Sequence, residues 1–104
     1  MKQAPVLDPS LHQPARLQIC AMLANVASAE FAKLREITGV SDSVLSKHLS
    51  AMSDAGYVTL SKAAQDGRQR TWVSFTRKGR KAFAGHMAAL QDLVASAEQA
   101  IAAE

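Results

Sequence analysis

A stretch of small polar and basic side chains, "SDSVLSKHLS" at residues 41–50, carries the clearest chemical signal in the sequence. Leu45, Leu49 and Met52 recur every three to four residues, which predicts the buried face of a helix. The side chains outside that face are short or basic, and they suit the phosphates, base edges and thymine methyl groups of DNA. The pattern therefore predicts a helix for the major groove of double-stranded DNA, with contacts from Ser41, Ser43, Val44, Ser46, Lys47 and Ser50.

The charge distribution indicates the same kind of partner. The chain has a net charge of +3, yet residues 43–81 alone hold eight basic and two acidic side chains. Arg68 and Arg70 lie at and just after a predicted hairpin tip, where arginine suits a narrow minor groove or a phosphate. A polyanion is the expected partner of such a segment, and an ordinary solvated surface is the alternative. The same two interpretations hold for the cluster Arg77, Lys78, Arg80 and Lys81.

Catalytic and metal-binding chemistry have little support in the sequence. It contains no carboxylate pair, nucleophile motif or glycine-rich phosphate loop, so we expect neither enzyme activity nor a cofactor. Cys20 stands alone among apolar neighbours, which predicts a buried thiol. His12, His48 and His86 lack the spacing of metal ligands. His48 falls at the margin of the packed helix face, where it either closes the helix packing or contacts DNA.

Periodicity and capping predict the elements that position these side chains. The chain of 104 residues is expected to form a single domain. Ser28 and Ser41 are the expected N-caps of a second and a third helix, and Gly39 is expected to end the second. A shorter helical turn over 9–12 would begin at Asp8. The expected helices cover residues 14–26, 29–38, 42–55 and 77–102.

After residue 56 the period changes from helical to alternating. Residues 58–60 and 71–75 alternate between apolar and polar side chains and flank the pair Asp66-Gly67, which favours a hairpin. This pattern predicts a two-stranded ribbon with a basic tip. Trp72 should lie on the ribbon face opposite Val73, where it either covers the protein's own surface or stacks on a nucleic-acid base.

Together these elements predict an α+β, mainly α fold, a winged helix-turn-helix with a two-stranded β-wing and a long C-terminal dimerisation helix. The last helix has a heptad-like seam without an obvious partner inside so small a domain. A two-fold homodimer would cover the seam and present two recognition helices to a near-palindromic operator. The alternative is that this helix folds back over its own domain. The seam consists of Phe83, Met87, Leu90, Val94, Ala97 and Ile101.

Three segments resemble winged-helix regulators of the MarR/ArsR type from bacteria and archaea. They are "HQPARLQICAML", "EFAKLREITGVSDSVLSKHLSAMSDAGYV" and "DGRQRTWVSFTRKGRKAF". The resemblance extends over about residues 8–85 and includes the Asp-x-Arg pattern of the wing. It implies a dimeric transcriptional regulator, usually a repressor, with its third helix in the major groove and a wing arginine near the minor groove. The corresponding residues here are Ser43, Val44, Lys47 and Arg68.

The sequence also departs from this family. ArsR-type metal sensors commonly carry a cysteine pair near the recognition helix, and this chain has Cys20 alone. MarR-type chains usually have extra helices that form a ligand pocket, so a small-molecule effector is left open. The N-terminus lacks the continuous apolar stretch of a secretory signal, and we expect a cytoplasmic protein. The competing function is a winged-helix module that binds other proteins without specific DNA binding.

Overall fold

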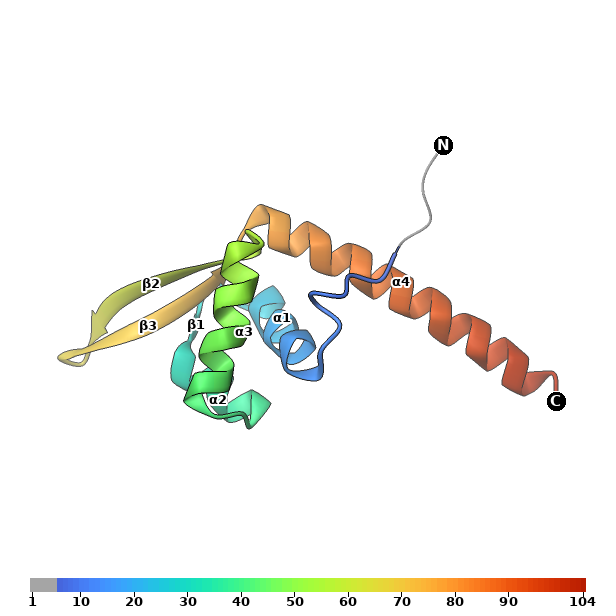
Figure 1. Ribbon diagram of the computed structural model, residues 1–104, viewed down its shortest axis with the longest axis horizontal. Coiled ribbons are helices and arrows are strands. Elements are labelled where there is room, and N and C mark those ends of the chain that lie inside the picture. The colour runs from blue at the N-terminus through green and yellow to red at the C-terminus, as the bar shows by residue number, and fades with distance from the viewer. Residues whose placement is uncertain (1–5) are drawn as a thin grey trace.

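Short helices and a small antiparallel sheet pack around one hydrophobic core, and a long helix extends away from it (Figure 1). The structure is a computed structural model that describes residues 6–104. Its elements are α1 (Pro14–Asn25), β1 (Ala29–Glu30), α2 (Phe31–Thr38), α3 (Asp42–Asp54), β2 (Val58–Gln65), β3 (Arg68–Phe75) and α4 (Arg77–Ala102). The sheet order is β1-β3-β2, and both pairings are antiparallel.

Capping side chains set the start of α3 and of α4. The Ser41 hydroxyl accepts a hydrogen bond from the backbone N–H of Val44 at 3.2 Å, as the sequence predicts. The Thr76 hydroxyl accepts one from Gly79 at 2.9 Å. Gly39 ends α2 with a φ of 70°, a left-handed conformation that glycine adopts without the steric cost of a Cβ atom. The helix ends predicted at Ser41 and Gly39 are confirmed.

The predicted start of the second helix is wrong. Ala29 pairs with Val73 and Glu30 with Trp72, so these two residues form the edge strand β1. The helix begins only at Phe31, and its N-cap is Glu30 instead of Ser28. The physical reason is tertiary, because the free edge of β3 offers backbone partners and the pairing buries the Ala29 side chain. A capping preference depends only on neighbouring residues, so it cannot predict pairing with a strand that lies more than 40 residues away.

The wing is the hairpin formed by β2 and β3. Its register runs from Val58 opposite Phe75 to Gln65 opposite Arg68. Asp66 and Gly67 have φ values of 53° and 77°, the left-handed values that a tight two-residue hairpin requires. The predicted two-stranded ribbon and its turn are confirmed, and β1 adds a third strand at its base. In Figure 1 the hairpin extends from the body on the side opposite the free end of α4.

The core combines apolar side chains from every part of the fold. Leu45, Leu49 and Met52 of α3 are at most 2% exposed, which confirms the predicted packed face. Cys20 is fully buried, as expected, and burial raises the pKa of its thiol to about 12. Residues 9–11 form a turn after Asp8, and Leu11 of this turn is completely buried in the core. The N-terminal turn is therefore an integral part of the fold.

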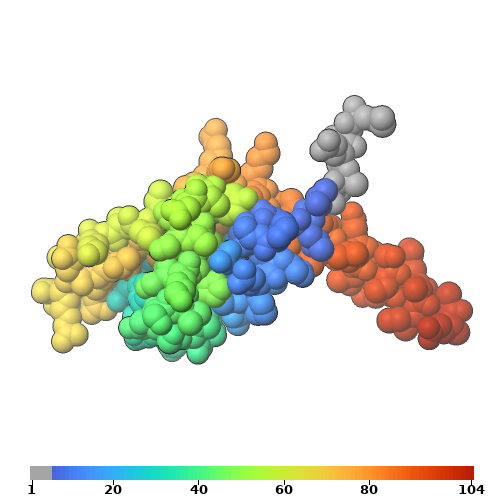
Figure 2. Space-filling model, viewed as in Figure 1, coloured from blue at the N-terminus to red at the C-terminus, as the bar shows by residue number. Residues whose placement is uncertain are grey.

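Only the first half of α4 packs against the rest of the protein. Gly79, Phe83, His86 and Ala89 are buried, whereas every residue from 91 to 104 is exposed. Figures 1 and 2 show this second half standing free of the body. The alternative in which the helix folds back over its own domain therefore does not hold for this half. No helix within residues 6–104 is long and apolar enough to cross a membrane.

Candidate nucleic-acid interface

The outward face of α3 presents the predicted polar residues together. Ser41, Ser43, Ser46, Lys47 and Ser50 are all exposed. Val44, which lies among them, is 40% exposed although it is apolar. The opposite side of the same helix packs in the core, so the exposed side is a surface of short side chains. Short side chains allow the backbone of such a helix to enter the major groove of DNA closely.

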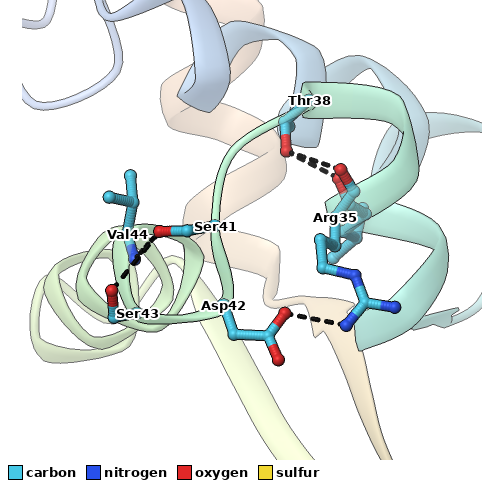
Figure 3. Close-up of polar contacts among 7 residues, drawn as sticks. Arg35, Thr38, Ser41, Asp42, Ser43 and Val44 are labelled. Atoms are coloured by element: carbon cyan, nitrogen blue, oxygen red, sulfur yellow. Dashed lines mark hydrogen bonds and ion pairs between the residues drawn. The ribbon is translucent and has the colours of Figure 1, made fainter.

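The turn between α2 and α3 fixes the position of this surface (Figure 3). Arg35 of α2 donates a hydrogen bond to Asp42 at 2.8 Å, which joins the end of one helix to the start of the next. The hydroxyl of Ser41 caps α3 and also lies 3.3 Å from the hydroxyl of Ser43. Ser41 is thus part of the turn itself, and any contact it makes with DNA has to be compatible with this capping bond.

His48 lies where α3 packs on α1. Its side chain is half-buried, and its Nδ1 atom accepts a hydrogen bond from Nε of Arg16 at 2.9 Å. Partial burial and the neighbouring Arg16 charge lower the pKa of His48 below the ordinary histidine value of 6.5. Of the two interpretations of this residue, the packing one agrees with its environment. Arg16 is a residue that the sequence analysis missed, although it is the one charged side chain in the helix "PARLQICAMLAN".

The two wing arginines have different surroundings. Arg68 is exposed next to the turn of the hairpin. Arg70 instead forms an ion pair with Glu30 at the start of α2, at 2.7 Å between Nη1 and Oε1. The Arg70 side chain is only 31% exposed, and its Nε atom is buried without a hydrogen-bond partner among the described residues. The structure therefore leaves Arg68 available to an external partner and engages Arg70 in holding the wing to the body.

We expect this difference to appear in stability measurements. Arg70→Ala should lower the free energy of unfolding by about 1 to 2 kcal/mol, because it leaves the partly buried Glu30 carboxylate unpaired. The matched substitution Arg68→Ala removes an exposed charge and should change it by less than about 0.5 kcal/mol. Urea unfolding followed by circular dichroism measures both. Equal effects of the two substitutions would contradict the distinction.

Aromatic rings hold part of the basic cluster at the start of α4. The Lys78 ammonium lies 5.7 Å from the centre of the Tyr57 ring, and the Arg80 guanidinium 5.6 Å from that of Phe75. Arg77 and Lys81 are exposed. Figure 2 shows side chains in this part of the chain standing out from the surface. The cluster is thus a second positive surface that the helix dipole does not favour.

Trp72 is half-buried at the base of the wing. It borders a recess together with Met22 of α1, Val26 just after that helix and Lys33 of α2. This environment agrees with the interpretation in which the ring covers the protein's own apolar surface. Among residues 6–104, no group of three or more histidine, cysteine or acidic side chains is arranged to hold a metal ion.

Comparison with known proteins identifies the family. Residues 15–94 match the winged helix DNA-binding domain family. The uncharacterised protein MJ0432 of Methanocaldococcus jannaschii is 33% identical over 72 residues, which are 69% of this chain and 78% of that protein. The HTH-type transcriptional regulator YgaV of Escherichia coli is 36% identical over 64 residues, 62% of this chain and 65% of that protein.

A solved structure shows the same architecture. A MarR family transcriptional regulator from Silicibacter pomeroyi is 27% identical, and it superimposes with a TM-score of 0.67 over 83% of this chain and 56% of that chain. This chain therefore spans little more than half of that regulator. The expected resemblance to MarR-type regulators is confirmed in fold and in sequence. The protein belongs to the winged helix DNA-binding domain family and has the fold of MarR-type transcriptional regulators.

Proposed function

We infer that the protein is a sequence-specific, homodimeric regulator of transcription, and that it acts as a repressor in the cytoplasm. The observation that carries this proposal is the exposed polar face of α3, together with an exposed arginine at the wing tip, on a winged helix body. Lys47 and Arg68 add positive charge to this surface. A repressor function follows if the bound protein occupies DNA that the transcription machinery needs.

The chemistry of α3 suits the major groove. Ser43, Ser46 and Ser50 carry hydroxyl groups that donate to phosphates or base edges, and Val44 offers methyl groups to thymine. Lys47 is long enough to reach a guanine or a phosphate. Arg68 at the wing tip suits the adjacent minor groove, where negative potential attracts arginine. Arg70 contributes by holding the wing in position through Glu30.

The apolar seam of α4 from Met87 to Ile101, most of it in the free half of the helix, is the proposed dimer interface. Met87, Val94 and Ile101 are 42%, 54% and 69% exposed, which is unusual for apolar side chains at regular helical spacing. Ala97 is exposed on the same seam, and Leu90 is half-buried. Phe83, the first seam residue, packs in the core of its own protomer, so the free surface begins after it. A two-fold axis along this surface would present two α3 helices to one near-palindromic site.

The direct test combines DNA selection with two substitutions. Duplex DNA fragments are selected with the purified full chain, and affinity for the recovered fragment is measured at several salt concentrations. Lys47→Ala and Arg68→Ala should each weaken binding about tenfold and reduce the salt slope by about one. Both variants should unfold like the wild type, because these side chains are exposed.

Lys33→Ala is the matched control. It removes one exposed positive charge from α2, where Lys33 pairs with Glu36 at 3.8 Å and is not among the proposed contacts. We expect its affinity to stay within about twofold of the wild type. Equal losses in Lys33→Ala and Lys47→Ala would reduce the effect to overall charge and refute the contact assignment. Weak binding without sequence preference would favour the protein-interaction module instead.

A further inference from the structure

A continuous chain of hydrogen bonds links α4 to α3 by way of the N-terminal turn. It starts at His86 of α4, passes through the turn at Asp8 and Ser10, crosses α1 at Arg16 and ends at His48 of α3. In Figure 1 the N-terminal segment runs beside α4 before it enters α1. The two end residues are histidines, and both act as acceptors through the Nδ1 atom. Neither interaction has a part in the proposed DNA contacts.

The bond at the α4 end requires a neutral His86. The backbone N–H of Asp8 donates to Nδ1 of His86 at 2.8 Å, and this amide has no acceptor form. Nδ1 therefore carries no proton, and the single ring proton of a neutral His86 lies on Nε2. Nε2 in turn lies 3.2 Å from Nδ1 of His12, so in this tautomer the Nε2–H of His86 donates a hydrogen bond to His12. A second proton on His86 would place two N–H groups opposite each other at Asp8.

The bond at the α3 end has the same requirement. Arg16 donates through Nε to His48 at 2.9 Å and through Nη1 to the carbonyl oxygen of Ser10 at 2.8 Å. An arginine cannot accept a hydrogen bond, so a protonated His48 would lose this partner and face a positive charge. Arg16 therefore connects α3 to the turn only while His48 is neutral.

The groups around His86 do not compensate for an added proton. Asp8 and His12 face it from the turn, Tyr57 reaches the Asp8 carboxylate from the segment after α3, and Cys20 of α1 lies in the field of Asp8. Burial, followed by the repulsion of His12, lowers the pKa of His86 below 6.5, and the attraction of Asp8 only partly offsets this.

Asp8 is itself fully occupied by neutral donors. Burial opposes its charged form, but hydrogen bonds from Ser10 and from the Tyr57 hydroxyl at 2.7 Å outweigh this, and the pKa of Asp8 is lowered. The carboxylate thus stays charged well below the range in which a histidine titrates. The two histidines are the groups of this chain of hydrogen bonds that respond between neutral and mildly acidic pH.

We propose that residues 8–12 form a pH-dependent clamp between α4 and α3. The clamp is closed while His86 and His48 are neutral, and protonation of these two rings opens it. The sign follows from linkage. The unfolded chain binds protons at histidine with a pKa of about 6.5 and the folded chain at a lower pKa, so the unfolded state takes up more protons as the pH falls. The clamp contributes its full stabilisation above pH 6.5 and loses it progressively below.

Nuclear magnetic resonance of the full-length free protein tests the clamp without DNA. At pH 7.5 the ring nitrogens of His86 should identify the tautomer with the proton on Nε2. Between pH 7.5 and 5 the backbone amide signal of Asp8 should shift together with the titration of His86. Titration of His86 at or above pH 6.5, or an Asp8 amide that does not respond, would overturn the proposal.

Two asparagine substitutions test the energetic consequence. The Oδ1 atom of asparagine lies where Nδ1 of histidine does and accepts a hydrogen bond, but it does not titrate in this range. Between pH 7.5 and 5 the folded-to-unfolded ratio of the wild type, from urea unfolding, should fall at least about tenfold more than that of the double variant His48→Asn and His86→Asn. His12→Asn should weaken the dependence without abolishing it, because it removes the repulsion that helps to lower the pKa of His86 but leaves the hydrogen bonds of His86 and His48 in place. An equal dependence in the wild type and the double variant would refute the clamp.

Discussion

Replacing Gly79 by alanine should prevent stable folding, although the residue lies in the first turns of a helix and alanine is the better helix former. A Cβ atom at this position would overlap the carbonyl oxygen of Tyr57 and would lie 2.8 Å from its carbonyl carbon. It would also lie 2.9 Å from Cδ1 of Phe75. The Tyr57 carbonyl cannot move aside freely, because it accepts a hydrogen bond from the N–H of Thr76 at 3.0 Å. We expect a loss of about 3 kcal/mol or more, a large part of the stability of a small domain.

Gly85 provides the matched control in the same helix. A Cβ atom there meets nothing within 4 Å, and the residue is exposed. Gly85→Ala should therefore raise the free energy of unfolding by about 0.5 to 1 kcal/mol. Urea unfolding monitored by circular dichroism compares both variants with the wild type. A Gly79→Ala protein as stable as the wild type would show that α4 does not approach the Tyr57 backbone this closely.

Val94→Asp should abolish dimerisation and, with it, tight binding to the operator. Val94 is 54% exposed in the free half of α4, so the substitution is harmless within one protomer. At a dimer interface it would place a carboxylate in an apolar seam, at a cost that a small interface cannot compensate. Losing the second protomer removes half of the DNA contacts, and we expect operator affinity to fall by at least about 100-fold.

Val94 tests the seam more cleanly than Leu90 does. Leu90 is half-buried, so Leu90→Asp would disturb the protomer as well as the interface. Ser96→Asp is the control, because it adds the same charge to an exposed position on the other side of α4. Sedimentation velocity should give a monomer for Val94→Asp and a dimer for Ser96→Asp. A dimeric Val94→Asp protein would exclude the free half of α4 from the interface.

Local sequence signals predicted most of the fold. The packed positions Leu45, Leu49 and Met52, the cap at Ser41 and the hairpin turn at Asp66-Gly67 are determined by nearest neighbours along the chain, and all are confirmed. The exposed face of α3 follows from the same periodicity. A candidate site built on a single amphipathic helix can therefore be read from the sequence before its target is known.

Tertiary structure decided the features that depend on distant partners. Strand β1 exists because β3 offers it an edge, and Arg70 differs from Arg68 because Glu30 is within reach. The chain of hydrogen bonds between His86 and His48 joins residues up to 78 positions apart, and no residue spacing in the sequence predicts it. The sequence by itself thus determined helices, turns and the character of α3, since these arise from contacts a few residues apart. Only the folded chain decided which polar side chains are occupied internally and which are left for a partner, because hydrogen bonds and ion pairs require proximity in space.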